Sequence, residues 1–202
     1  MATQEELSTD EARIAELKSQ IDELRLENGT LRLQLDVLSS TDIVTGLPNT
    51  NGILQTLDSV VARHNRAGEA FGVMLVRVPA IATIGEHHGR AGVNDALRHA
   101  GALIAAGLRR LDMVGRLDDS AFLAVLPMLD EAGCDTVVTR LSKLLASVPM
   151  TFERDRLEMK PQITIALSAP GVDLGSQIIV GRVLEKSDEP GDDGVQIFTL
   201  SA

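Results

Sequence analysis

Aromatic residues and cysteine are scarce in this sequence of 202 residues. It contains no Trp, no Tyr and four Phe, so few side chains could stack on nucleic-acid bases. Its single cysteine, Cys134, cannot form an intrachain disulfide and belongs to no cluster of metal-ligating residues, which favours a reducing compartment. We expect Cys134 to pack as a small apolar residue on a helix.

An excess of positive charge and long hydrophobic runs are also lacking. The net charge of −10 argues against nucleic acid or an anionic membrane surface as the main partner, because both require a basic surface. No apolar run approaches the roughly 18 residues that a membrane span requires, and the first residues are polar and acidic. We therefore expect a soluble, cytoplasmic protein that does not act at a membrane.

Hydrophobic residues in the first forty positions recur at alternating spacings of three and four. The series is Ile14, Leu17, Ile21, Leu24, Asn28, Leu31, Leu35 and Leu38. Ile at a and Leu at d positions are typical of a parallel two-stranded coiled coil, and a single Asn at an a position specifies the dimer at a cost in stability. We predict a coiled-coil dimerisation helix over residues 1–40. The alternative is a single amphipathic helix folded against the rest of the chain.

The heptads stop before a turn, Thr45-Gly46-Leu47-Pro48-Asn49, which marks the start of a second domain over residues 41–202. Periodicity and breaks in this part predict helices and strands in alternation, which is typical of an α/β fold with a central sheet flanked by helices. The expected helices cover 50–66, 90–109, 130–147 and a short stretch between the loops 170–174 and 188–194. The expected strands cover 72–78, 112–117, 122–127, 162–169 and 195–200.

The predicted hairpin at 112–127 has a recognisable frame. Arg116, Phe122 and Pro127 fall at the spacing of the motif R-Y-G-G-D/E-E-F-x-x-x-L-P, with Asp-Asp-Ser-Ala at 118–121 in place of its central letters. In this, the segment resembles the signature of the GGDEF domains of diguanylate cyclases, and the resemblance extends from about residue 41 to 198. It implies a GGDEF-like, nucleotidyl cyclase-type fold preceded by a signalling helix.

The resemblance also locates the residues that would carry the reaction. The family holds metal ions with carboxylates from its first strand and its hairpin, where this chain has Arg77 and Ser120. An arginine repels a divalent cation, and Ser120 brings no charge to offset it. At the family's guanine-recognising positions stand Gly85 and Asn94. We therefore predict a degenerate diguanylate cyclase without activity, with no catalytic residue, no metal and no cofactor; an active cyclase of unusual sequence is disfavoured.

A second group of residues matches a ligand-binding motif of the same family. Arg109-x-x-Asp112 resembles the family's inhibitory site, which binds cyclic di-GMP, and Arg140 falls where related cyclases supply another arginine. Guanidinium groups suit phosphate and the O6/N7 edge of guanine, while a carboxylate accepts from N1–H and N2–H. The alternative is that Arg109 and Asp112 form a helix-end charge pair and that Arg140 is a solvated surface residue. We predict that Arg109, Asp112 and Arg140 bind cyclic di-GMP.

Two functions of different class follow. The leading hypothesis is a catalytically inactive, homodimeric GGDEF protein that senses cyclic di-GMP and transmits its state to an unidentified protein partner. The alternative is a scaffold or localisation protein that binds no nucleotide and acts through protein–protein contacts. Binding of cyclic di-GMP distinguishes the two.

Overall fold

The computed structural model of the chain describes residues 4–38, 40–152, 155–171, 173–189, 191 and 193–201. The chain divides into two compact units, residues 1–39 and 40–202, and each is described by itself. Within the described residues, no helix is both long enough and apolar enough to cross a membrane.

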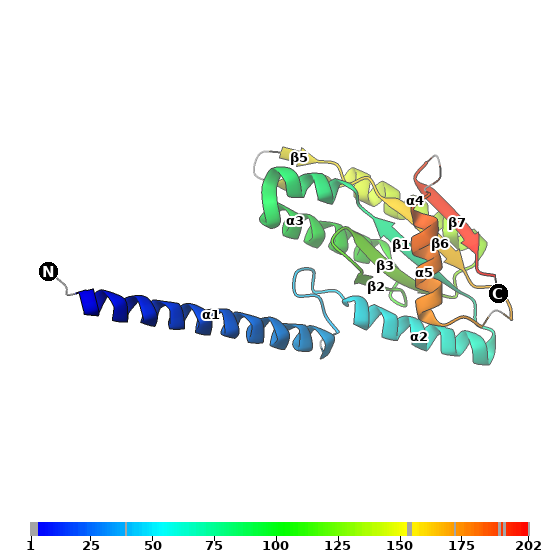
Figure 1. Cartoon of the computed structure of the whole chain (residues 1–202). Helices are drawn as coiled ribbons and strands as arrows, with labels where there is room; N and C mark the ends of the chain where they lie inside the picture. Colours follow the sequence, from blue (N-terminus) through cyan, green and yellow to red (C-terminus); the bar gives the residue numbers. More distant parts are fainter. Residues whose placement is uncertain are drawn as a thin grey trace. The chain divides into compact units, whose positions relative to one another are not determined.

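The first unit consists of one helix, α1 (Gln4–Leu38) (Figure 1). Five of the predicted heptad residues are 47–56% exposed in the single chain: Ile14, Leu17, Ile21, Leu24 and Leu31. Asn28 interrupts this apolar stripe, and its Nδ2 donates to the Leu24 carbonyl at 3.1 Å. The heptad side chains at positions 35 and 38 lie outside the described part of the structure. Dimerisation through this stripe stays a prediction.

The second unit is built on a five-stranded sheet in the order β2-β3-β1-β6-β7 (Figure 1). The central strand β1 pairs antiparallel with β3 and β6, β2 pairs antiparallel with β3, and β7 runs parallel to β6. The strands are β1 (Phe71–Arg77), β2 (Met113–Arg116), β3 (Ala121–Pro127), β6 (Gln162–Leu167) and β7 (Val195–Thr199). In a separate two-stranded sheet, β4 (Met150–Phe152) pairs antiparallel with β5 (Asp155–Leu157).

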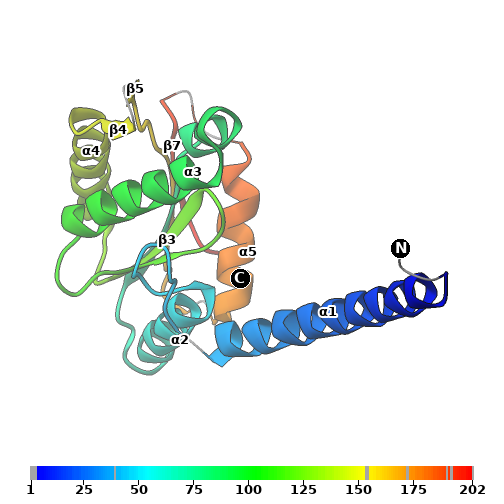
Figure 2. The same cartoon turned by 90° about the vertical axis from the view of Figure 1, so that its left-hand side faces the viewer.

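Helices cover both faces of the sheet (Figure 2). One face is packed by α3 (Ala80–Gly107) and α4 (Glu131–Ser147), and the other by α2 (Thr50–Ala67) and α5 (Ser176–Ser187). This arrangement confirms the predicted α/β fold with a central sheet flanked by helices.

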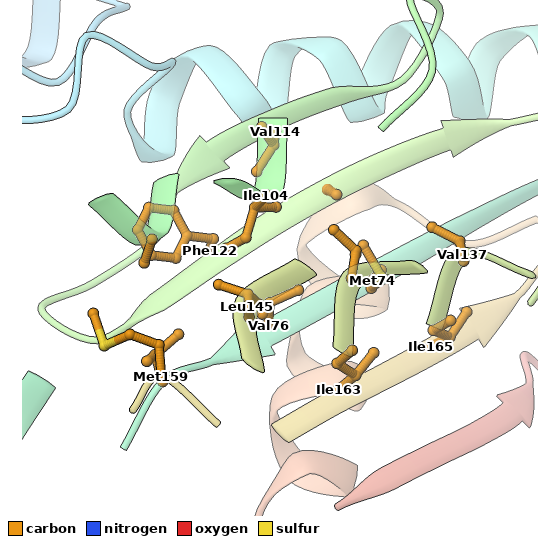
Figure 3. Close-up of a cluster of buried hydrophobic side chains, with 14 of the residues drawn as sticks. Met74, Val76, Ile104, Val114, Phe122, Val137, Leu145, Met159, Ile163 and Ile165 are labelled. Atoms are coloured by element: carbon orange, nitrogen blue, oxygen red, sulfur yellow. The ribbon is translucent and has the colours of Figure 1, made fainter. Parts of the chain in front are cut away.

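The sheet has a hydrophobic core on each face, because successive side chains along a strand point to opposite faces. In β1, Met74 and Val76 point to the α3–α4 face, whereas Val73 and Leu75 point to the α2–α5 face. Figure 3 shows Met74 and Val76 among the buried side chains of the first core, together with Phe122 of β3. Burial of each large apolar side chain contributes about 1.5–3 kcal/mol. Because both faces of β1 and β3 are buried, β3 is apolar throughout and β1 is apolar up to Val76, before Arg77 at its end.

The helix α3 begins at Ala80, well before the expected start at residue 90. Gly89 lies inside it with φ 60° and ψ −160°, a left-handed conformation that residues with a Cβ rarely adopt. The helix therefore changes direction at Gly89, and its two parts do not share one apolar phase. This kink explains why periodicity predicted only the second part.

Candidate functional site

The turn between β2 and β3 is held by the side chain of Arg116. Its Nε donates to the Asp118 carbonyl at 3.0 Å, and its two terminal nitrogens lie 3.1 Å from Asp42 Oδ2 and 3.0 Å from Asp119 Oδ1. Within the turn, Asp118 Oδ1 accepts from the Ser120 backbone N–H at 2.7 Å. Residues 118–121 therefore form a hydrogen-bonded turn.

Asp42 ties this turn to the loop that precedes α2. The side chains of Asp42 and Arg116 are 15% and 17% exposed. Asp42 Oδ1 accepts from the Thr45 hydroxyl at 2.7 Å and from the Thr45 backbone N–H at 2.8 Å. Burial acts to raise the pKa of Asp42, but these hydrogen bonds and the Arg116 charge outweigh it and lower the pKa below its ordinary value. The carboxylate is therefore ionised at neutral pH and fixes the loop to the turn.

A cleft of about 470 Å³ opens beside this turn. Gly85 and Asn94 of α3, the positions that the resemblance assigned to guanine recognition, both line it, and so does Ser120. The full set is Val44, Ile81, Ala82, Gly85, Gly89, Arg90, Val93, Asn94, Arg116, Asp119 and Ser120. The structure thus brings together residues that lie far apart in the sequence. The volume of the cleft is in the range of small-molecule binding sites.

Arg77, at the end of β1, does not line this cleft. Its Nε donates to Ser187 Oγ at 3.1 Å, and one terminal nitrogen lies 3.4 Å from Asp188 Oδ1, so the side chain joins β1 to the end of α5. Among the described residues, no group of three or more His, Cys, Asp or Glu could hold a metal ion. At the two positions where the resemblance placed the family's metal-binding carboxylates the chain has Arg77 and Ser120, neither of which is a carboxylate, and we derive no step through a metal ion.

The predicted ligand residues Arg109, Asp112 and Arg140 line one shallow depression on another part of the domain. Arg109 and Asp112 lie in the loop between α3 and β2, and Arg140 lies on α4. Leu126, Pro127, Leu129, Gly133, Thr136 and Val137 complete the lining. The fold therefore joins two segments that are separated in the sequence by β2 and β3.

The groups of this depression differ in how they are held. Asp112 Oδ2 accepts from the Arg109 backbone N–H at 2.7 Å, which fixes the carboxylate and leaves its other oxygen available. In the part of the chain that the structure describes, neither the Arg109 nor the Arg140 guanidinium forms an ion pair or hydrogen bond. In a chain with 29 acidic residues, these two arginines, which have no acidic partner among the described residues, bring positive charge to one depression.

Sequence reasoning missed two parts of these sites. The Asp42–Arg116 pair joins residues 74 positions apart, and no local pattern signals it. Thr136 also lines the depression, and its spacing of four from Arg140 on a helix could have revealed it, because such residues share a helix face.

Comparison with known proteins identifies the family to which this chain belongs. The family described as "Diguanylate cyclase, GGDEF domain" matches residues 39–179. The chain belongs to this GGDEF family.

Individual relatives agree with this assignment. The chain is 27% identical over 178 residues to "Response regulator PleD" of Caulobacter vibrioides, covering 87% of this chain and 38% of that protein. It is 24% identical over 119 residues to "Diguanylate cyclase DgcP" of Pseudomonas aeruginosa, covering 59% of this chain and 18% of that protein. The chain thus spans less than half the length of these relatives.

Among solved structures, the coiled coil and GGDEF domain of DgcB from Caulobacter crescentus, in complex with c-di-GMP, has a TM-score of 0.69 to this chain. It is 16% identical and covers 94% of this chain and 98% of that one. At this identity the likeness shows the fold alone.

These comparisons contradict the prediction that the chain is not an enzyme. The matching family is described as diguanylate cyclase, and DgcP carries the same name. The prediction of a degenerate cyclase without activity weighed a few positions of the signature, whereas the match extends over residues 39–179. That prediction is wrong.

Proposed function

We propose that this GGDEF protein takes part in cyclic di-GMP signalling and binds cyclic di-GMP through Arg109, Asp112 and Arg140. The main support for this proposal is that these three residues line one depression. Both guanidinium groups are unpaired among the residues that the structure describes. The bound ligand in the DgcB structure supports the same ligand class. Guanidinium groups complement its two phosphates, and the free oxygen of Asp112 can accept from guanine.

The binding site is tested by calorimetric titration of the full chain with cyclic di-GMP. Arg140→Ala should weaken binding by about 30-fold, the equivalent of about 2 kcal/mol for a lost charged hydrogen bond. Lys143→Ala is the control, because Lys143 is an exposed cation on the same helix that does not line the depression. Equal weakening by both variants would indicate a general charge effect and would contradict a specific site.

Dimerisation through α1 is the second part of this proposal. The exposed stripe from Ile14 to Leu31 gives a second copy of the helix an apolar surface to cover. The e positions of the first three heptads are basic: Lys18, Arg25 and Arg32. An antiparallel pair would place these charges opposite one another, whereas a parallel pair places Glu27 near Arg32 of the second copy. A parallel homodimer is therefore favoured.

Diguanylate cyclase activity is a further candidate, favoured by the relatives' names and by the cleft beside the β2–β3 turn, where GTP would bind. Purified protein is incubated with GTP and Mg²⁺ or Mn²⁺, and cyclic di-GMP is measured by chromatography. Product that is lost in an Asn94→Leu variant would support activity at this cleft. No product with either metal would contradict it.

An unidentified protein partner and a cytoplasmic location complete the proposal. The alternative, a scaffold that binds no nucleotide, would be supported if cyclic di-GMP produced no heat on titration while the chain remained folded and dimeric.

A further inference from the structure

One face of α4 borders, over two turns, the depression that Arg109, Asp112 and Arg140 line. Gly133, Thr136, Val137 and Arg140 all line it. Their spacings of three, four and seven place them on one stripe of the helix. Val137 is buried and belongs to the apolar floor. Thr136 and Arg140 are exposed, so their polar groups stand at the rim where a ligand would lie.

The Thr136 hydroxyl has no hydrogen-bond partner among the residues that the structure describes. Some other helical hydroxyls are bonded to the backbone: Thr56 donates to the Gly52 carbonyl at 3.1 Å and Ser187 to the Leu184 carbonyl at 2.7 Å. A free hydroxyl one turn before an unpaired arginine, both on the same depression, presents a neutral and a charged donor to the same space.

We propose that Thr136 is a further ligand-binding residue of this site and donates from its hydroxyl to a phosphate oxygen of cyclic di-GMP beside Arg140. This inference rests on the proposed cyclic di-GMP site. Hydrogen bonds to an ionised oxygen are shorter and roughly twice as strong as neutral ones, so a hydroxyl at this rim adds selectivity for the phosphate.

The helix supplies its own control. Thr139 is the same residue type on the same helix and is exposed, and its hydroxyl also has no partner within the described residues, but it does not line the depression. Valine replaces threonine with nearly the same shape and remains β-branched, so Thr136→Val and Thr139→Val remove a hydroxyl with similar small effects on the helix. Any difference between the two variants therefore reports the position and not the substitution.

The experiment is calorimetric titration of four versions of the whole 202-residue chain with cyclic di-GMP: the parent, Thr136→Val, Thr136→Ser and Thr139→Val. Thr136→Val should weaken binding by about fivefold to tenfold, the effect of one lost hydrogen bond. Thr136→Ser keeps the hydroxyl and should bind within about twofold of the parent, and so should Thr139→Val. Circular dichroism of each variant verifies that α4 is intact.

The outcomes separate this inference from the function on which it rests. If the parent binds and Arg140→Ala is weakened, but Thr136→Val binds as tightly as Thr139→Val, the role of Thr136 is overturned and the site stands. Equal weakening by Thr136→Ser and Thr136→Val would also overturn it, because the hydroxyl would then make no difference. A parent that does not bind cyclic di-GMP overturns both proposals.

Discussion

The Asp42–Arg116 ion pair joins the loop before α2 to the β2–β3 turn, and the structure allows the effect of its removal to be worked out. Asp42→Asn keeps an oxygen that can accept from Thr45, but it removes the charge and turns an amide group toward Arg116. The arginine, 17% exposed, then loses one of its charged partners. A hydrogen bond between charged groups contributes about 1.5–3 kcal/mol, so the unfolding free energy should fall by about 2–3 kcal/mol at neutral pH.

The assay is urea unfolding of the parent and of Asp42→Asn, with thermal unfolding as a second measurement. For a domain of this size the loss corresponds to about 5–10 °C in Tm. Asp119→Asn is the control: its carboxylate contacts the same arginine at 3.0 Å, but its side chain is 99% exposed. Water and salt screen such a pair, so this variant should unfold like the parent. Equal destabilisation by both variants would refute the reasoning from burial.

The same variant has a defined pH dependence. The pKa of Asp42 in the folded protein lies below its ordinary value of 3.8. A carboxyl group with a depressed pKa stabilises the fold above the unfolded pKa, and this contribution disappears as pH falls through the folded pKa. The difference between the parent and Asp42→Asn should therefore be complete at pH 6–7 and should shrink below about pH 4.

Two other expectations concern α1 and α4. Light scattering should give the mass of a dimer for the full chain, and Asn28→Leu should raise the thermal stability of that dimer while broadening its oligomeric states, because a buried Asn at an a position is a specificity device; a monomeric parent would contradict both. Burial and the nearby Asp135, Asp130 and Glu131 raise the pKa of the Cys134 thiol to about 11, so folded protein should not react with a thiol reagent at pH 8, whereas protein unfolded in urea should react at once; rapid reaction of the folded protein would contradict this environment.

The order of the elements could be predicted because each one carries a local pattern. The strands β3 and, up to Val76, β1 are continuous apolar runs, and α2 and α4 have apolar periodicity. The motif residues Arg116, Phe122 and Pro127 fix the register of β2 and β3. The N-terminal part of α3 was missed because Gly89 breaks the helical phase. Pairing between elements, such as that of Arg77 with Ser187, depends on contacts over 110 positions that no local pattern encodes.

The candidate sites, like the fold, could be predicted only in part from the sequence. Motif spacing identified Arg109, Asp112 and Arg140, and it also identified Gly85 and Asn94, which the structure brings to one cleft. The sequence could not show that the two arginines of the depression are unpaired, since that depends on what packs around them. The inference about enzymatic activity was wrong because replacements in a signature describe a few contacts, whereas the family match covers most of the globular unit.

The most direct test of the central claim is titration of the whole 202-residue chain with cyclic di-GMP, with Arg109→Ala and Arg110→Ala measured beside it. Arg110 is the neighbouring exposed arginine and does not line the depression, so it controls for loss of one positive charge. We predict binding at micromolar affinity or tighter, corresponding to about 8 kcal/mol, a loss of about 30-fold in Arg109→Ala, and little change in Arg110→Ala. No heat with the parent at high micromolar protein, or equal affinity in the parent and Arg109→Ala, would contradict the claim.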